Sequence, residues 1–521
     1  MPFLQNYDFC LADSEILLIF ATKSINICPR MKKTNRIDIM MKKIIQWVSA
    51  ALLVCCIMTP YSCVKVDDPD PIQPSEELTL LRQDNRVSLY TFEYPSVNAK
   101  GEPVVLSALL IAWTPGDRQE NDSIEAVHVF NHITITADDE CPSSEDKPTE
   151  QTMISLVPNR EYKSYTTGER ADYVGRCIII APDYEGYGIS KNTPHPYLSQ
   201  RLTAQQVVDA VQCGLKIYRK STGVNQRLLP IKSDWRMFAI GYSQGGAVTL
   251  AVQRYIEENN LAAPLHFQGS ICGDGPYDLI TTIRYYIDDD GTSYGTETKH
   301  RKGIVTMPIV MPLIIKGMCY ANPLLAPYGI ENYLSQQLID TGVLDWIDSK
   351  EYTTSDISQM WYSQLKNGLE KDGRHYTPEQ MAEMLVTPEG DVWGCLEKML
   401  TKECYDYLSN PDNFVKVPTK ADNAMAAMHI ALAENSLTTG WTPKHRIYFM
   451  HSKSDTVVPY GNWQSFRDAH ADEEGTLFRV DDTFSTGDHV GAGVTFYTSF
   501  GFRNTAPAFN WLCESTTKKK F

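Results

Sequence analysis

Residues 237–246 read Met-Phe-Ala-Ile-Gly-Tyr-Ser-Gln-Gly-Gly, an apolar run that leads through a glycine-flanked serine. The run predicts a buried strand, and apolar side chains at helical spacing over residues 247–256 predict a helix directly after it. So abrupt a turn leaves no room for side chains two positions from Ser243, where Gly241 and Gly245 stand. The turn strains the backbone at Ser243 and lifts its hydroxyl clear of the sheet, which predicts a serine nucleophile.

A second stretch matches the same glycine and serine spacing. Residues 291–295 read Gly-Thr-Ser-Tyr-Gly, but they follow three aspartates and lead into the polar run Thr-Glu-Thr-Lys. No apolar strand or apolar helical face flanks Ser293, so we interpret this copy as a solvated loop. The surrounding pattern therefore selects Ser243.

Short apolar runs of strand character recur along the rest of the chain. The first two flank a turn and predict an antiparallel hairpin, and residues 202–218 predict a helix with one apolar face. The predicted strands are, in order, residues 87–92, 104–111, 126–130, 177–181, 237–242, 266–271, 446–450 and 477–480. Strands that alternate with helices predict an α/β fold, with a mostly parallel sheet covered by helices on both faces. Ser243 then follows the fifth strand.

About 160 residues separate the sixth predicted strand from the seventh, which is too long for a loop. The interval is rich in helix-like runs, and we predict a helical cap over residues 280–440. It contains the apolar run Ile-Val-Thr-Met-Pro-Ile-Val-Met-Pro-Leu-Ile-Ile at residues 304–315. That run either lines an acyl or aromatic pocket or packs as ordinary core, and the sequence leaves both interpretations open.

A serine nucleophile needs a base that takes its proton and a carboxylate that orients the base. A strand–serine–helix turn of this kind is followed in the chain first by the acid and then by the histidine. Asp455 fits the acid, because it stands in the loop after the strand at residues 446–450. His489 fits the base, in the run Thr-Gly-Asp-His-Val-Gly-Ala-Gly after the last strand, where glycines let a loop bring the imidazole over the serine.

Three neighbouring residues are alternatives for these roles. His451 precedes the acid and His470 falls in a polar helical run, so we interpret both as structural or solvated. Asp488 adjoins His489, but adjacent residues of an extended loop point in different directions, which favours Asp455 as the acid.

The oxyanion that forms during attack needs preorganised hydrogen-bond donors. The N–H of Gln244 is the first candidate, because it opens the helix whose positive end lies beneath the same atom. The second donor is expected in the loop after the third strand, which contains His132 and Ile133. The turn Ala-Pro-Asp-Tyr-Glu-Gly-Tyr-Gly at residues 181–188 is expected to shape the site without taking part in the chemistry.

These motifs together resemble the secretory lipase family of α/β-hydrolases: the serine turn, the Pro-Asp-Tyr-Glu-Gly-Tyr-Gly turn, the long insertion, the acid before Val-Val-Pro and the late histidine. The resemblance covers most of the chain and implies an α/β-hydrolase core at residues 80–279 and 441–521, with the insertion as a lid over an acyl-binding tunnel. It also implies hydrolysis of carboxylic esters through an acyl-enzyme, with Ser243, Asp455 and His489 as the catalytic triad.

Other functions are compatible with the same residues. The pocket would equally suit a feruloyl or acetyl ester linked to a polysaccharide. A peptidase of the same fold is less favoured, because the chain has no clear acidic pair for a substrate α-amino group. A non-catalytic surface binding protein predicts an eroded triad, whereas all three members are present in order.

Composition narrows the partners. The 521-residue chain has a formal net charge of −16, which argues against a nucleic-acid partner. We identify no metal-binding motif among its 11 histidines and its cysteines, so we expect neither a metal nor another cofactor. The expected partner is a small or polysaccharide-linked ester substrate.

The N-terminal part predicts export. Residues 41–63 combine a basic start with an apolar run of about 15 residues, which is typical of a signal peptide and short of the about 20 that a membrane span needs. Because signal peptides stand at the N-terminus, we interpret residues 1–40 as an over-called start. The segment ends in Tyr-Ser-Cys, which resembles a bacterial lipobox, and residues 64–79 form an acidic, proline-rich tether. We expect a bacterial lipoprotein at the cell surface or in the periplasm, with membrane contact only through Cys63.

The later cysteines fall largely in apolar patterns, where buried free thiols are expected. Bridges that involve Cys141, Cys395 or Cys404 stay open for an exported protein, because sequence does not assign connectivity.

Overall fold

The computed structural model describes residues 74–83, 87–116, 119–144, 176–288, 302–371, 394–481, 487–502, 508, 511 and 512. The chain divides into two compact units, Met1–Pro71 and Ile72–Phe521, and the described residues belong to the second. The predictions for residues 1–63 and for Ser293 lie outside the described residues, as does most of the tether. They stay predictions from sequence.

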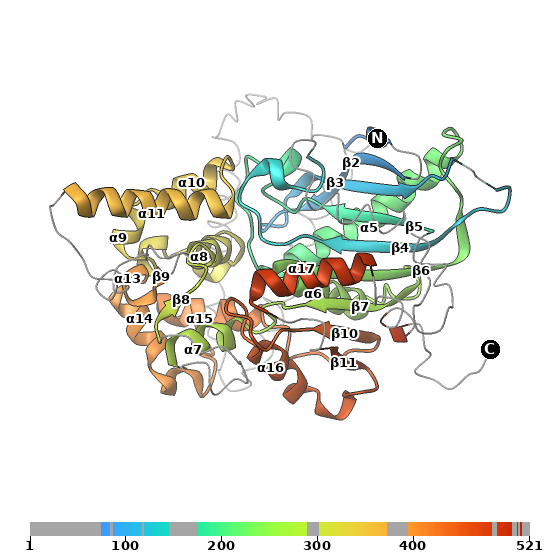
Figure 1. The fold of residues 1–521 in the computed structure, drawn as a ribbon. Coiled ribbons are helices and arrows are strands. Elements are labelled where there is room, and N and C mark those ends of the chain that lie inside the picture. Colours follow the sequence, from blue (N-terminus) through green and yellow to red (C-terminus); the bar gives the residue numbers. More distant parts are fainter. Residues whose placement is uncertain are drawn as a thin grey trace, which may run out of the picture. The chain divides into compact units, whose positions relative to one another are not determined.

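A nine-stranded sheet forms the centre of the second unit (Figure 1). Its strands are β1 (Thr79–Gln83), β2 (Val87–Val97), β3 (Pro103–Trp113), β4 (Ile124–Asn131), β5 (Cys177–Pro182), β6 (Ile231–Tyr242), β7 (Phe267–Gly273), β10 (Arg446–Met450) and β11 (Phe478–Asp481). Their order is β1-β2-β3-β5-β4-β6-β7-β10-β11. The pairs from β1 to β5 are antiparallel and every pair from β5 to β11 is parallel. The predicted hairpin and the mostly parallel sheet are confirmed.

The strand count differs from the prediction by one. Ser243 follows the sixth strand instead of the fifth, and the long insertion follows β7 instead of a sixth strand. The additional strand is β1, which pairs with β2 at the edge of the sheet and is mostly exposed. An exposed edge strand has no buried face, so it lacks the alternating apolar pattern that reveals a strand in sequence.

Helices cover the sheet and fill the insertion. The α-helices are α5 (Gln200–Thr222), α6 (Gln244–Glu258), α7 (Leu279–Asp288), α8 (Val310–Ala321), α9 (Gln336–Ile339), α10 (Val343–Ser349), α11 (Thr354–Lys371), α13 (Leu396–Met399), α14 (Lys402–Ser409), α15 (Ala424–Glu434), α16 (Gly461–Ala469) and α17 (His489–Phe502). Short 3-10 helices are η1 (Asp138–Glu140), η2 (Gly188–Ser190), η3 (Pro323–Leu325), η4 (Ile330–Asn332), η5 (Pro411–Phe414) and η6 (Ala471–Glu473). Within the part of the chain that the structure describes, none of the helices is both long and apolar enough to cross a membrane.

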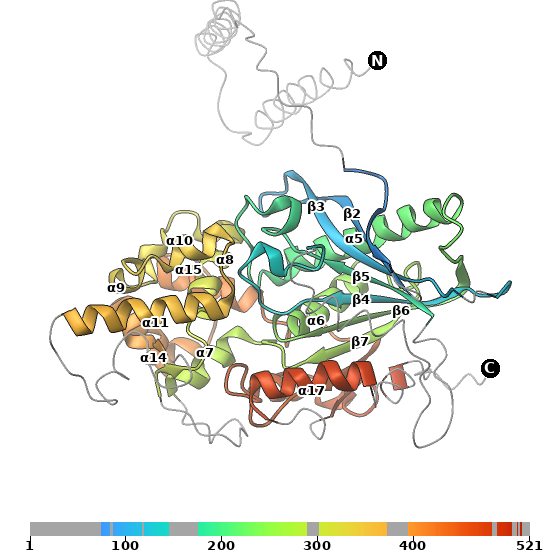
Figure 2. The same cartoon turned by 45° about the horizontal axis from the view of Figure 1, so that its top comes forward.

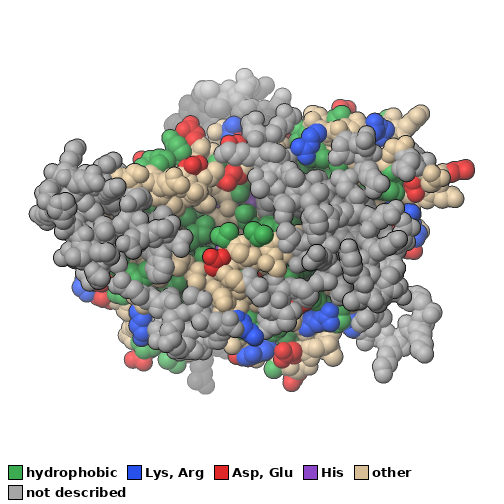
Figure 3. All heavy atoms as spheres, viewed as in Figure 1, with side chains coloured by type: hydrophobic (Ala, Val, Ile, Leu, Met, Phe, Trp, Pro, Cys, Tyr) green, Lys and Arg blue, Asp and Glu red, His purple; other side chains and the backbone are tan. Residues whose placement is uncertain are grey.

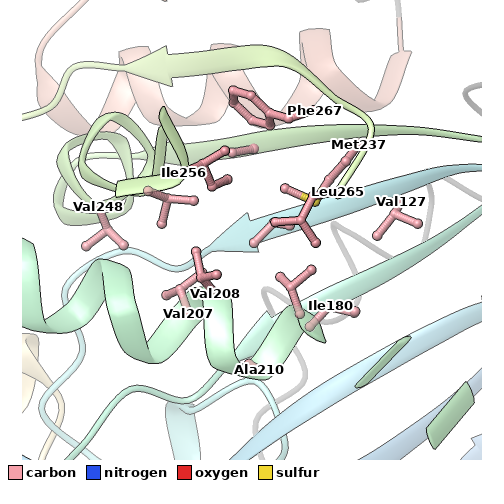
Figure 4. Packing of buried hydrophobic residues seen from close by; sticks show 14 of the residues in the cluster. Val127, Ile180, Val207, Val208, Ala210, Met237, Val248, Ile256, Leu265 and Phe267 are labelled. Atoms are coloured by element: carbon pink, nitrogen blue, oxygen red, sulfur yellow. The ribbon is translucent and has the colours of Figure 1, made fainter. Parts of the chain in front are cut away.

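Alternating side chains of β6 point to the two faces of the sheet. Met237 and Ala239 pack with buried residues of α5 and α6, and Figure 4 shows this contact around Met237. Phe238 and Ile240 pack on the opposite face, where Phe496 of α17 lies. Figure 2 shows α5 and α17 on opposite sides of the strands. A sheet covered on both faces explains why the buried stretch of β6, residues 237–242, is mostly apolar on both of its faces, as the sequence predicts.

The insertion between β7 and β10 is helical and has its own apolar core. It contains α7 to α15 and a small two-stranded sheet, β8 (Ile304–Val305) with β9 (Gly394–Cys395). Ile309 is fully buried in this core, and Met311 and Ile314 border an apolar cavity of only about 20 Å³. Of the two interpretations of residues 304–315, the structure therefore favours core packing. Seen from the side of Figure 1, hydrophobic side chains also gather between α8 and α17 (Figure 3).

Cysteines in the described part of the chain are free thiols. They include Cys141, Cys395 and Cys404, all of them buried. Burial raises the pKa of the Cys404 thiol to about 12, so this group is a neutral member of the core of the insertion.

The turn from β6 through Ser243 into α6, which we call the elbow, has the strained geometry that the sequence predicts. Ser243 adopts φ 57° and ψ −124°, outside the regions that side chains favour. A Cβ atom on Gly245 would lie 2.0 Å from the carbonyl oxygen of Asn131, and one on Gly241 would lie 2.3 Å from the carbonyl oxygen of Gly245. These contacts are with backbone atoms, which have no rotamer to change.

We expect Gly245→Ala to destabilise the protein by about 3 kcal/mol or more, because overpacking against backbone must shift β4 or α6. The measurement is the free energy of unfolding in urea. The matched control is Gly223→Ala at the end of α5, where φ is −73° and the nearest atom to a new Cβ is 3.5 Å away. That control should be neutral or slightly stabilising. Equal stability of the two variants would contradict the close contact at the elbow.

Candidate active site

Ser243 stands between the last residue of β6 and the first residue of α6. Its N–H donates to the carbonyl oxygen of Gly273 at 2.9 Å, which joins the turn to the end of β7. Its side chain is only partly buried. The N–H of Gln244 occupies the first position of a 15-residue helix and has no carbonyl four residues before it within that helix. An N–H donor and the positive end of the helix therefore lie beside the serine hydroxyl.

The structure brings Ser243, His489 and Asp455 into one hydrogen-bonded row. His489 Nε2 lies 2.9 Å from Ser243 Oγ, and His489 Nδ1 lies 2.6 Å from Asp455 Oδ2. Asp455 is fully buried and His489 is 8% exposed. An ionised carboxylate only accepts, so Nδ1 carries the proton and Nε2 is free to accept from the serine hydroxyl. The row therefore has the proton arrangement that a serine nucleophile requires.

Asp455 is held by donors on both of its oxygens. Its Oδ1 accepts the N–H groups of Val457 at 2.8 Å and Val458 at 2.7 Å, while Oδ2 accepts from His489. Burial acts to raise the pKa of this carboxyl, but the imidazoles of His489 and His451 outweigh it and the pKa lies below its ordinary value. Asp455 is therefore the anion of the site.

His489 is the first residue of α17, so the expectation of a glycine-rich loop around it is wrong. The carboxylate of Asp488 accepts the N–H of Gly491 at 2.8 Å, which caps the helix directly before His489. The glycine at 493 has a packing role, since a Cβ there would lie 2.9 Å from the ring of Tyr242. Asp488 itself is exposed and serves the helix cap.

The two alternative histidines have other partners. His451 is fully buried with Nε2 3.0 Å from the carbonyl oxygen of Val458, and burial lowers its pKa to about 4. His470 is also buried and packs against the ring of Phe466, with ring centroids 4.6 Å apart. Both are structural residues, as the sequence predicts.

The loop after β4 lies against the elbow. A Cβ on Gly245 would approach the carbonyl oxygens of both Asn131 and His132, so the backbone that leads to Ile133 passes beside Ser243. The imidazole of His132 is occupied, with Nδ1 2.6 Å from the carbonyl oxygen of Ile133 and Nε2 3.1 Å from that of Asp183. Burial lowers its pKa to about 4, so the ring is neutral. Backbone N–H groups of the loop, and not this ring, are the remaining candidates for the second oxyanion donor.

The turn at residues 181–188 supports the elbow. The side chain of Gln244 donates from Nε2 to His195 Nε2 at 3.0 Å, and the other ring nitrogen of His195 donates to the carbonyl oxygen of Glu185 at 2.7 Å. Asp183 accepts from Ser107 Oγ at 2.5 Å and Ser143 Oγ at 2.6 Å. These contacts fix the first residue of α6 by its side chain and leave its N–H to face the site.

The sequence analysis did not identify three residues that surround the row of Ser243, His489 and Asp455. Asp274 follows β7 directly and is fully buried beside Asp455. The hydroxyl of Tyr242 donates to the carbonyl oxygen of His489 at 2.6 Å, and Ser452 Oγ donates to the carbonyl oxygen of Gly487 at 2.6 Å. The available signal was position, because Asp274 ends a strand next to the nucleophile strand, at the edge where sites of α/β sheets form.

Asp274, Asp455 and His489 also have the spacing of a metal site, since one ligand atom of each lies within 4.8 Å of the others. Hydrogen bonds account for this grouping. Asp455 uses one oxygen for backbone amides and the other for His489, and Asp274 accepts the N–H of Ser452. We therefore treat the three as a hydrogen-bonded group and assign no metal to them.

No protein-family model matches the chain, and no curated relative matches it. Its fold is similar to that of the rice cell wall degrading esterase LipA from Xanthomonas oryzae, with a TM-score of 0.53 and 18% identity over 82% of this chain and 95% of that one. It is also similar to a protein from Legionella pneumophila, with a TM-score of 0.54 and 15% identity over 84% of this chain and 92% of that one.

At these identities the likeness concerns the fold, and it extends over nearly the whole length of both solved structures. The parallel sheet, the strained serine between β6 and α6 and the helices on both faces are the parts of that fold seen in this chain. The chain therefore has the α/β-hydrolase fold, as its sequence predicts.

Proposed function

We propose that the chain is a serine hydrolase of carboxylic esters, of the esterase or lipase type, and that it works through an acyl-enzyme. The observation that carries this proposal is the row in which His489 lies 2.9 Å from Ser243 Oγ and 2.6 Å from Asp455. Both distances lie in hydrogen-bond range before any substrate binds, which supports a site preorganised for proton transfer. The likeness in fold to an esterase is a second support.

In the first half of the proposed reaction, Ser243 Oγ attacks the ester carbonyl carbon while its proton passes to His489 Nε2. Asp455 accepts from Nδ1 throughout, which holds the tautomer and stabilises the imidazolium. The Gln244 N–H and one N–H of the loop at residues 132–133 donate to the oxyanion. The intermediate then collapses, Nε2–H returns the proton to the leaving alcohol oxygen, and the acyl group stays on Ser243.

In the second half, water takes the place of the alcohol. It loses a proton to His489 Nε2 and attacks the acyl carbon, and the second collapse returns the proton to Ser243 Oγ with release of the carboxylic acid. Each proton transfer passes through His489 Nε2, which already lies 2.9 Å from Ser243 Oγ. The proposed reaction needs no cofactor.

The substrate class that we propose is an ester with a small acyl group. The support is the packed interior of the insertion, where Met311 and Ile314 border only about 20 Å³, which is room for about one water molecule. A long acyl chain would have to displace side chains there. The hydrophobic side chains between α8 and α17 offer apolar surface for a shorter group. The acetyl esters of polysaccharides carry such a small group, and their feruloyl esters are the bulkier alternative. Both substrates suit export through the signal segment predicted at residues 41–63.

The first test is Ser243→Ala with a short p-nitrophenyl ester as substrate. We expect kcat/KM to fall by several orders of magnitude with the fold intact, because the nucleophile is lost. Ser293→Ala, at the other glycine-flanked serine, is the matched control and should keep wild-type activity. Activity that survives in Ser243→Ala or disappears in Ser293→Ala would place the nucleophile elsewhere.

A second pair of variants tests the acid. Asp455→Asn should lower kcat by about 10⁴-fold, because an amide at this position favours the wrong imidazole tautomer. Asp488→Asn makes the same change one residue before the histidine, at a side chain that only caps α17. It should change kcat by less than about threefold, since a cap contributes about 1 kcal/mol to stability and nothing to proton transfer. The reverse order of effects would make Asp488 the acid.

Chain-length preference tests the substrate class. With p-nitrophenyl esters from acetate to palmitate, we expect kcat/KM to be highest for the short esters, because the interior of the insertion is full. A maximum at long chains would indicate a lipase whose insertion opens. An absence of turnover with every ester, together with normal folding, would favour a peptidase or a non-catalytic binding protein on the same scaffold.

A further inference from the structure

Two carboxyl groups share one buried space behind the histidine. Asp274 and Asp455 are each fully buried, and a carboxyl oxygen of one lies within 4.8 Å of a carboxyl oxygen of the other. Two carboxylate anions at such a distance repel strongly where water is absent, and they can hydrogen-bond to one another only when one of them carries a proton. One of the two must therefore hold a proton when the other is ionised.

The donors around the pair decide which carboxyl keeps the proton. Asp455 accepts three N–H donors, from Val457, Val458 and the imidazole of His489, each within 2.8 Å. Asp274 accepts the N–H of Ser452 at 3.2 and 3.3 Å on its two oxygens and faces the hydroxyl of Tyr242 at 3.2 Å. The shorter and more numerous donors stabilise negative charge on Asp455.

We propose that Asp274 is a positioning residue of the active site, which stays protonated and donates its carboxyl proton to Asp455. This proposal rests on the proposed function for its effect on the reaction, but the protonation itself does not depend on that function. The directions of the two pKa values agree with it. Burial, and then the charge of Asp455, raise the pKa of Asp274 well above its ordinary value, while that of Asp455 is lowered.

Asp274 also links the three segments that carry the row. Through the N–H of Ser452 it holds the loop after β10, and the hydroxyl of Ser452 in turn holds Gly487 before the histidine. Through Tyr242 it contacts the residue before the nucleophile, and the same hydroxyl donates to the carbonyl oxygen of His489. Loss of its side chain would therefore loosen the acid and the base together.

Other titratable groups surround the pair. They are Tyr242 of β6, Cys272 of β7, Tyr277 after β7, His451 before the acid and His489 of α17. Burial raises the pKa of the two tyrosines and the thiol and lowers that of His451. The two tyrosines, the thiol and His451 are therefore neutral near pH 7, which leaves the Asp455 carboxylate as the charge that acts on Asp274.

The first experiment compares Asp274→Asn with Asp274→Ala on a short p-nitrophenyl ester. The amide of asparagine has the same shape, is neutral, donates to Asp455 and accepts from Ser452, so Asp274→Asn should retain most of the wild-type kcat. Asp274→Ala should lower kcat by about 10²-fold with little change in KM, as expected when a reacting geometry loosens. Asp278→Asn, a nearby carboxylate that accepts from Thr281 and Ser465, is the control and should leave kcat unchanged.

The second experiment measures the proton without any reaction. Asp274 keeps a proton in the folded protein and loses it in the unfolded protein above about pH 4. The unfolding equilibrium of the wild type, relative to Asp274→Asn, should therefore shift toward the unfolded state by up to tenfold for each pH unit above about 4. Urea unfolding from pH 4 to pH 8 measures this shift, and it can be repeated in the Ser243→Ala background.

The outcomes of the two experiments test the protonation of Asp274 and the proposed function separately. A ratio of the two unfolding constants that does not change with pH would show that Asp274 is ionised, and would overturn the protonation. An Asp274→Asn variant as impaired as Asp274→Ala would show that a negative charge is needed there, which also overturns the proposal. If Ser243→Ala stays active while the pH-dependent shift is seen, the proposed function fails and the proton on Asp274 stands.

Discussion

The backbones of β4 and α6 meet so closely that a methyl group on Gly245 would lie 2.0 Å from the carbonyl oxygen of Asn131. This contact sets where the first turn of α6 begins, and with it the positive φ of Ser243. The strain is sustained by the packing around it, because Phe238 and Ile240 on one side and Met237 and Ala239 on the other hold β6 between two cores. The nucleophile, the Gln244 N–H and the loop that leads to Ile133 all take their positions from this one close approach.

Hydrogen bonds then fix the acid, Asp455, and the base, His489, relative to the serine. Tyr242, the residue before the serine, hydrogen-bonds the backbone of His489, and Ser452 hydrogen-bonds the backbone just before it. Asp455 is held by backbone N–H groups of its own loop. These bonds lie in buried surroundings, where a polar group without a partner is costly. The arrangement is therefore stable only when the three segments are assembled together.

The insertion contributes to the same arrangement. The hydroxyl of Tyr286 in α7 donates to the carbonyl oxygens of Thr456 and Val457, and Thr306 Oγ1 donates to that of Thr456 at 2.7 Å. All three contacts reach the two residues that follow the acid. On another side, Tyr320 of α8 donates to Glu185 at 2.6 Å, a buried carboxylate in the turn behind the elbow. A movement of the insertion would therefore displace the loop that holds Asp455.

The sequence by itself determined the elements whose signals are local. The strand–serine–helix turn, the alternation of apolar strands with helices and the order of Ser243, Asp455 and His489 could be predicted, because period, glycine placement and chain order are properties of the sequence. The edge strand β1 was not predicted, because it is mostly exposed and has no buried face that would leave an apolar pattern in the sequence. The role of Gly493 was misread, because its reason is the ring of Tyr242, which lies far away in the chain. Asp274 and its contact with Asp455 were decided only by the tertiary structure. The approach of two carboxyl groups from the end of β7 and the loop after β10 has no signature in either segment, and it exists only because folding brings both out of water.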